Sequence, residues 1–320
     1  MSIAACSVGS RVAFQRARGS VHSVYRQACN IELHDGTLLT LLARGLGNLP
    51  HGIRCALPGA ADFQLWLHRG QAVAGDSLAL CIAQAGVAVD LSSAERWRCR
   101  LEACALDARA APTVRAMLLV RRLLREQAPR GGFAPLVLDG ADPGSSLERA
   151  MQRRLMRTLP ELDRAGRSLD PALAVKALEQ LAGLGPGLTP SGDDFIVGYL
   201  AALYSRRSRE SMLRPFLREL LRMLAPLAAA ANLISRQFIF NALEGEFSEG
   251  LAELVSAIAT RDEVRLRESV AQVVRVGHSS GADSLVGLLF GLRPSLVLGC
   301  AARPCALPVG RRSPGTSSPS

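Results

Sequence analysis

The stretch GLGPGLTPSGDDFIVGYLAAL, residues 183–203, joins a loop rich in glycine and proline to an apolar helix. Gly185 and Gly187 permit positive φ angles, and the two prolines of the loop stiffen the backbone around them. Ser191 is the expected N-cap, so Gly192 starts a helix whose first backbone N–H groups point outward. A helix start of this kind attracts anions.

The same device occurs a second time in the chain. Residues 191–203 read SGDDFIVGYLAAL and residues 280–292 read SGADSLVGLLFGL, which share the pattern S-G-x-D-x-[IL]-V-G-x-L-x-x-L. We therefore predict two helices of one domain whose starts converge on a shared cleft and offer N–H groups to a small anion. Each pattern also fits a capping box, in which serine and aspartate satisfy backbone donors of their own helix. The capping pairs would be Ser191 with Asp194 and Ser280 with Asp283.

Two of the differences between the copies involve side chains that can carry chemistry: Asp193 corresponds to Ala282, and Thr189 corresponds to His278. Capping needs neither Asp193 nor His278, so we predict that these two residues are catalytic. A histidine upstream of a helix start carries protons or binds anions, whereas an aspartate there orients an amine, holds a cation or takes a proton. The alternative is a surface histidine and a first-turn carboxylate that complements the helix dipole.

Helical periodicity extends to both sides of the repeat, whereas the first third of the chain carries strand signals. An Asp-Gly turn at residues 35–36 predicts a hairpin, and a short helix is expected at Ala94. Helices are predicted within residues 115–130 and at residues 147–159, 171–182, 195–204, 209–224, 227–243, 248–258, 263–276 and 284–292.

The predicted fold class is α+β, with a β-rich N-terminal domain followed by an all-helical C-terminal domain. The glycine-rich segment GGFAPLVLDGADPGSS at residues 131–146 marks the boundary before the helical domain. We expect a β-rich domain at residues 1–105, a connecting helix and loop at 106–145, a helical domain at 146–301 and a disordered tail at 302–320.

Charge and composition exclude several classes of function. The formal net charge is +10, but the basic residues are scattered, and all but Lys176 are arginines, so nucleic acid is not an expected partner. The cysteines form no CxxC pair and the N-terminus lacks the features of a signal peptide, which favours a cytoplasmic protein. The apolar runs are much shorter than the roughly 20 residues of a membrane-spanning helix.

Several segments together resemble the AllH family. The C-terminal ones are the glycine-rich stretch at 183–203, NLISRQFIFNALEGEFSE at 232–249 and VGHSSGADSLVGLLFGL at 276–292. The N-terminal ones are VHSVYRQACNIEL at 21–33, DGTLLTLL at 35–42, GNLPHGI at 47–53 and VDLSSAERW at 89–97. The resemblance implies a subunit of oxamate carbamoyltransferase that acts with FdrA-type and AllG-type subunits in allantoin breakdown. The implied reaction is the reversible phosphorolysis of oxalurate to oxamate and carbamoyl phosphate.

Because all substrates of that reaction are small anions, we expect the repeated helix starts to bind them. The predicted binding residues are Gly185, Gly187, Thr189, Ser191, Gly192, Asp194, Arg236, Ser279, Ser280, Gly281 and Asp283. No cofactor is expected, with Mg²⁺ at Asp193 and Asp194 as the alternative.

Other residues and functions stay open at this point. Arg236 also fits a surface position on its helix. His22, Asn48 and His51 would close the cleft from the N-terminal domain or serve as strand and turn residues. Two further functions compete with catalysis: a non-catalytic subunit that senses anions or nucleotides, and a scaffold in which the repeated motifs are helix caps only.

Overall fold

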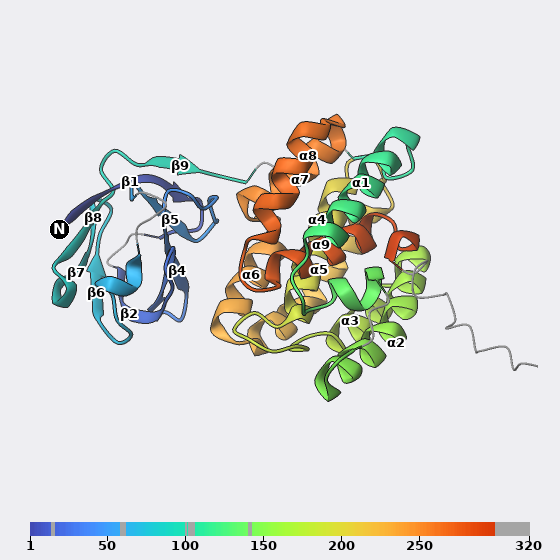
Figure 1. The fold of residues 1–320 in the computed structure, drawn as a ribbon, viewed down its shortest axis with the longest axis horizontal. Helices are drawn as coiled ribbons and strands as arrows, with labels where there is room; N and C mark the ends of the chain where they lie inside the picture. Colours follow the sequence, from blue (N-terminus) through green and yellow to red (C-terminus); the bar gives the residue numbers. More distant parts are fainter. Residues whose placement is uncertain (14–16, 58–61, 100, 102–105, 140–142, 298–320) are drawn as a thin grey trace, which may run out of the picture.

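The computed structural model describes residues 1–13, 17–57, 62–99, 101, 106–139 and 143–297. Figure 1 shows a part made of strands beside a larger part made of helices, as the predicted α+β class requires. The strands are β1 (Ser2–Gly9), β2 (Ala17–Val24), β3 (Ala28–Leu33), β4 (Leu38–Leu42), β5 (Gly52–Cys55), β6 (Ala72–Gly75), β7 (Ala79–Ile82), β8 (Val87–Asp90) and β9 (Glu95–Trp97).

The strands form one sheet that closes on itself. Its order is β5-β4-β3-β2-β6-β7-β8-β1-β9, and β1 also pairs with β5, which joins the first strand of the row to the last strand but one. Closure gives β5 a second partner and β1 a third, so the backbone groups of β5 do not remain at an open edge. The interior of this closed sheet holds its own apolar core, which includes Val21, Ile31 and Ile53.

The predicted Asp-Gly hairpin is confirmed, since it connects β3 and β4. Gly36 has a φ of 79°, and Asp35 Oδ1 accepts the Thr37 backbone N–H at 2.9 Å. The helix expected at Ala94 is wrong. The Asp90 carboxylate accepts the Ser92 N–H at 2.9 Å in a turn, and the chain then enters β9, which pairs in parallel with β1.

The helical part is built around two buried helices, α4 and α9. Nearly all of their residues are buried, and Figure 1 shows them in the middle of the helical part. The helices are α1 (Ala111–Gln127), α2 (Ser146–Ser168), α3 (Pro171–Glu179), α4 (Ser191–Arg206), α5 (Leu213–Ala230), α6 (Leu233–Leu243), α7 (Glu249–Thr260), α8 (Glu263–Val274) and α9 (Ser280–Leu292). Buried side chains of α1, such as Met117 and Val120, belong to the same apolar core as those of the later helices.

Two predicted helix ends next to prolines were wrong. The helix predicted to end at residue 159 continues as α2 to Ser168, with Pro160 inside it. The sequence suggested a break between residues 224 and 227, but Pro226 lies inside α5. The break comes instead at Asn232, whose side-chain oxygen accepts the backbone N–H groups of Ile234 and Ser235 at 3.1 Å. An asparagine cap therefore starts α6, and Pro226 does not end α5.

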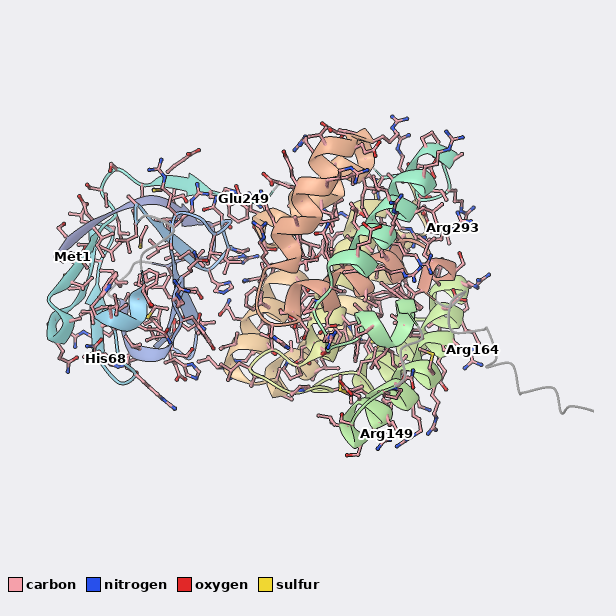
Figure 2. All side chains as sticks on the ribbon, in the orientation of Figure 1. Met1, His68, Arg149, Arg164, Glu249 and Arg293 are labelled. Atoms are coloured by element: carbon pink, nitrogen blue, oxygen red, sulfur yellow. The ribbon has the colours of Figure 1, made fainter. Side chains whose placement is uncertain are left out.

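The closed sheet and the helices meet at a polar interface, which we call the domain interface. Glu249 at the start of α7 accepts hydrogen bonds from the Asn48 backbone at 2.8 Å and the Asn48 side chain at 3.1 Å. Figure 2 labels Glu249 on the side of the helices that faces the sheet. The Asn241 amide of α6 lies 2.6 Å from Nδ1 of His51, whose ring is buried. Asn48 and His51 thus join the two parts of the chain.

None of the helices among the described residues has the length and apolar character needed to cross a membrane. The predicted tail at residues 302–320 lies outside the described residues, as do the last four residues of the predicted helical domain.

Candidate functional site

The repeated glycines allow α4 and α9 to pack against each other in parallel. A Cβ at Gly198 would lie 1.8 Å from the Ser284 carbonyl oxygen, and a Cβ at Gly287 would lie 2.1 Å from the Phe195 carbonyl oxygen. Both contacts are with backbone of the opposite helix, so neither position accepts a side chain without separating the helices. The parallel packing places the two helix starts side by side, as the sequence predicted.

Hydroxyl and carboxyl groups cross between the two helix starts. The Ser280 hydroxyl donates to Asp194 Oδ1 at 2.7 Å, and the Ser191 hydroxyl donates to Asp283. The capping boxes predicted within each helix are therefore wrong. Pro190 and Ser279 occupy the N-cap positions without a side-chain cap, and Ser191 is already helical. Each serine donates to the aspartate of the opposite helix, because Gly198 and Gly287 let the two helices approach closely.

The backbone of each helix start is tied to its own preceding loop. Gly192 N–H donates to Leu184 O at 2.9 Å, and Gly281 N–H donates to Val276 O at 3.1 Å. These two amides, which the sequence suggested for anion binding, already have acceptors within the protein. A ligand bound here would therefore contact mainly the hydroxyl groups and other side chains around these two amides.

Asp193 and the glycines of its loop form a second bracing contact. Asp193 is buried, and its Oδ1 accepts the Gly183 N–H at 2.8 Å. Gly185 and Gly187 adopt φ angles of 120° and 99°, as expected for a loop of this shape. Asp193 therefore holds the loop against α4. The replacement of Asp193 by Ala282 in the second copy did not predict this structural role.

A segment that the sequence analysis assigned only to a boundary loop covers Asp283. The Phe133 N–H donates to Asp283 Oδ1 at 2.6 Å, and the Ala134 N–H donates to the same carboxyl. Gly132 has a φ of 70°, and a Cβ there would lie 2.5 Å from Asp283 Oδ1. Only glycine at position 132 leaves room for the Asp283 carboxyl. The pair Gly131-Gly132 is therefore the one feature of the sequence that could have indicated this contact.

The two aspartates are in an environment that favours their protonated forms. Burial raises the pKa of Asp194 well above its usual value, and the nearby charges of Asp283 and Asp193 raise it further. Burial also raises the pKa of Asp283 to about 6, against the lowering effect of its hydrogen bonds from Phe133 and Ser191. Oδ2 of both Asp194 and Asp283 is buried and has no hydrogen-bond partner among the described residues. Carboxyls with raised pKa values beside hydroxyl groups are suited to proton transfer.

The remaining predicted site residues divide into two groups. Thr189 donates to Asp194, and Ser279 donates to Asp283, so both belong to the paired helix starts. His278 is exposed at the rim, where its Nε2 lies 3.8 Å from the position of a Cβ on Gly131. Arg236 lies elsewhere, because its guanidinium donates to Gly36 O of the closed sheet at 2.9 Å.

The N-terminal candidates do not join the paired helix starts through any contact of the described residues. Asn48 and His51 belong to the domain interface, and His22 Nδ1 lies 3.2 Å from the neighbouring Ser23 hydroxyl. Among the residues that the structure describes, no three His, Cys, Asp or Glu side chains are grouped to hold a metal. Mg²⁺ at Asp193 and Asp194 stays a prediction.

Two family models match the chain. Residues 2–96 match the AllH family N-terminal domain, and residues 181–292 match the family described as oxamate carbamoyltransferase subunit AllH. The chain belongs to the AllH family. The family name marks a subunit, so other subunits are expected partners. No solved structure matches this chain.

The second matched segment of the AllH family begins just before the glycine-rich loop and ends with α9. It therefore contains both helix starts and all four residues that pair across them. Phe133 and Ala134, which bind Asp283, lie between the two matched segments. We call residues 131–134 the covering loop; the two family matches do not include it.

Proposed function

We propose that this chain is a subunit of an oxamate carbamoyltransferase-like enzyme, and that its paired helix starts bind the small anionic substrates and transfer a proton between them. The observation that carries this proposal is the crossed pairing of two serines with two aspartates whose Oδ2 atoms are buried and have no hydrogen-bond partner among the described residues. The substrates would be oxalurate and phosphate in one direction, and oxamate and carbamoyl phosphate in the other.

The implied reaction has a clear need for a proton carrier. Phosphate forms a C–O bond to the carbamoyl carbon, the C–N bond to the oxamate nitrogen breaks, and the proton of the phosphate ends on that nitrogen. A carboxyl group with a raised pKa donates the proton to the leaving nitrogen and recovers it from phosphate. Asp194 meets this requirement because its burial favours the protonated form.

Burial of Asp194 also determines how the proton would reach a substrate. The Ser280 hydroxyl is hydrogen-bonded to Asp194 Oδ1 and is itself only partly buried. When Asp194 is protonated, this hydrogen bond can reverse, so that the carboxyl donates its proton to Ser280 Oγ while the hydroxyl passes its own proton to the substrate. A protonated Asp194 also repels an anion less than an ionised one would, which reconciles acidic helix starts with anionic substrates.

His278 completes the proposed site at its exposed rim. Its imidazole can donate a hydrogen bond to a phosphate oxygen or to the carbonyl oxygen as charge develops there. Asp193 contributes by fixing the glycine-rich loop through Gly183, rather than by touching a substrate. FdrA-type and AllG-type subunits would supply the remaining groups.

The test is the formation of carbamoyl phosphate from oxalurate and phosphate by the assembled subunits. We expect Asp194→Asn and Ser280→Ala to lower the rate by about 10²–10⁴-fold, the range for loss of a positioned acid or base. Asp163→Asn is the matched control, since Asp163 lies on the surface helix α2, in an ion pair with Arg167. Calorimetry with phosphate and carbamoyl phosphate on this chain measures binding separately. Full activity of Asp194→Asn in a folded complex would refute the catalytic role.

A scaffold is the second candidate function, and one observation favours it. The buried amides of Gly192 and Gly281 already have acceptors, and Asp283 is completely buried. If this chain only organises its partners, it will bind neither phosphate nor carbamoyl phosphate. The variants would then change the thermal stability of the complex and leave its rate per assembled complex unchanged.

A further inference from the structure

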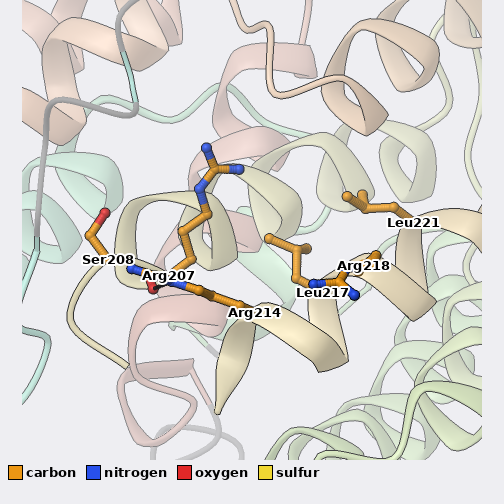
Figure 3. Close-up of a pocket in the computed structure, with 6 residues that line it drawn as sticks. All are labelled: Arg207, Ser208, Arg214, Leu217, Arg218 and Leu221. Atoms are coloured by element: carbon orange, nitrogen blue, oxygen red, sulfur yellow. Dashed lines mark hydrogen bonds between the residues drawn. The ribbon is translucent and has the colours of Figure 1, made fainter. Parts of the chain in front are cut away.

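A groove lined by arginines lies at the opposite end of α4 from the paired helix starts. Its volume is about 510 Å³, and Figure 3 shows the residues that line it at the turn between α4 and α5. They are Arg207, Ser208, Arg214, Leu217, Arg218 and Leu221. Since α4 has 16 residues, roughly 24 Å of helix separates this groove from Ser191. The groove is therefore distinct from the site proposed above.

The charges of Arg214 and Arg218 are not balanced by carboxylates of the described residues. Glu210 is paired with Arg206 at 2.9 Å, and Glu219 is paired with Arg222 at 2.5 Å. No carboxylate within the described part of the chain forms an ion pair with Arg214 or Arg218. The positive end of the α5 dipole and the negative end of the α4 dipole meet at this turn and oppose each other, so the positive field comes from the arginine side chains.

The groove is partly preorganised for a ligand. The Arg207 guanidinium lies 4.6 Å from the centre of the Tyr204 ring, and the Arg207 carbonyl accepts the Nε–H of Arg214 at 3.2 Å. These contacts restrict two of the three arginines before any ligand arrives. Leu221, which is only partly buried, supplies an apolar surface beside the charged groups, while Leu217 belongs to the core beneath it. The combination of arginines and an apolar surface suits a ligand that has both a phosphate and an apolar ring.

We propose that this groove binds a phosphate ester with an apolar group, of the size of a nucleoside diphosphate. Arg214 and Arg218 hold the phosphate oxygens, and Leu221 contacts the base or a similar ring. The volume falls within the range of about 300–1,000 Å³ that is usual for small-molecule sites. This inference does not depend on the proposed carbamoyl transfer, because it uses different residues at a different place.

Calorimetry on the full chain with ADP, inorganic phosphate and adenosine tests the proposal. We expect ADP to bind more tightly than phosphate, and adenosine to bind much more weakly than ADP. Arg214→Ala and Arg218→Ala should each weaken ADP binding about tenfold, as expected for loss of a charged hydrogen-bond donor. Arg222→Ala is the matched control, because it removes the same charge from the same helix outside the groove, and it should leave ADP affinity within about twofold.

Two further variants test the apolar contact and the location of the ADP site separately. Leu221→Ser should weaken the binding of ADP without affecting the binding of phosphate. Ser280→Ala should leave ADP affinity unchanged, which distinguishes this groove from the paired helix starts. The proposal is overturned if ADP binds no more tightly than phosphate, if Arg222→Ala weakens ADP as much as Arg218→Ala, or if the wild-type chain binds ADP no better than the Arg214→Ala/Arg218→Ala variant.

Discussion

The hydroxyl of Ser280, at the start of α9, donates a 2.7 Å hydrogen bond to Oδ1 of Asp194, in the first turn of α4. With its counterpart from Ser191 to Asp283, this contact ties two parallel helices together at their starts. A serine and an aspartate that look like a local cap in the sequence therefore act between helices. The predictions below follow from this arrangement and from the contacts around it.

The crossed pairing predicts which residues are energetically coupled. Ser280→Ala should destabilise the protein by about 1–3 kcal/mol, because it removes the Ser280 hydrogen bond to a buried Asp194 oxygen and leaves Thr189 as the side-chain donor to that carboxyl. In double-mutant cycles measured by urea unfolding, Ser280→Ala should couple with Asp194→Asn and show little coupling with Asp283→Asn. Ser211→Ala, in the exposed turn before α5, is the control for removal of a hydroxyl. Stronger coupling of Ser280 with Asp283 would mean that each helix caps itself.

Glycine at the helix crossing predicts a large effect from a single methyl group. Gly198→Ala would place a Cβ 1.8 Å from the Ser284 carbonyl oxygen, so the helices must move apart. We expect a loss of about 3 kcal/mol or more in the free energy of unfolding. Gly166→Ala is the control, since its Cβ would make an ordinary 3.9 Å contact with Tyr199 and alanine favours the helix by up to about 1 kcal/mol. Equal effects of the two substitutions would contradict the close crossing.

The raised pKa values predict how stability changes with pH. The folded pKa of Asp283 is raised from 3.8 to about 6, so the folded protein binds more protons than the unfolded chain between these pH values. The contribution of this group is complete below pH 3.8 and is lost as pH rises through about 6. Asp194 acts in the same direction, since burial above all, and then the charges of Asp283 and Asp193, raise its pKa well above its usual value.

Urea unfolding at a series of pH values measures this effect. Asp283→Asn should remove the part of the decline that falls between pH 3.8 and about 6, because asparagine does not titrate. Asp76→Asn is the control, as Asp76 is exposed and its pKa is lowered by the Leu78 and Ala79 backbone N–H groups, so it acts in the opposite direction. An unchanged decline in Asp283→Asn would show that other groups cause it.

The sequence predicted much of the fold because its patterns are local. The hydrophobic period defined the helices, and the Asp-Gly turn defined the hairpin between β3 and β4. The internal repeat also predicted that α4 and α9 begin alike and lie together. It could not show that Ser280 reaches Asp194, because the partner of a hydroxyl depends on how closely two helices approach. Gly198 and Gly287 determine that distance, and their effect appears only when both helices are in place.

The covering loop was missed for a related reason. Gly131-Gly132 is typical of many loops, and nothing local connects it with Asp283, which lies 150 positions later in the chain. Asn48 and His51 were considered as residues that close a cleft, whereas their contacts with Glu249 and Asn241 form an interface. Long-range polar contacts of this kind follow from the packing of two parts and have no sequence period.

The domain interface gives the last prediction, which concerns the coupling between the closed sheet and the helices. Glu249 accepts both the backbone and the side-chain N–H of Asn48, and its carboxylate lies 3.6 Å from Arg54. Glu249→Ala removes all three contacts and should lower the urea midpoint of the closed sheet. Trp66 packs against the apolar core of the sheet, whereas Trp97 packs against the core of the helices. With Trp97→Phe as the background for every variant, fluorescence reports on the sheet while circular dichroism reports mainly on the helices. In the otherwise wild-type chain we expect the two signals to change together; in Glu249→Ala the fluorescence should change first. Glu219→Ala, which breaks the exposed pair with Arg222, should keep the transitions coincident, and coincident transitions in Glu249→Ala as well would show that the interface does not couple the two parts.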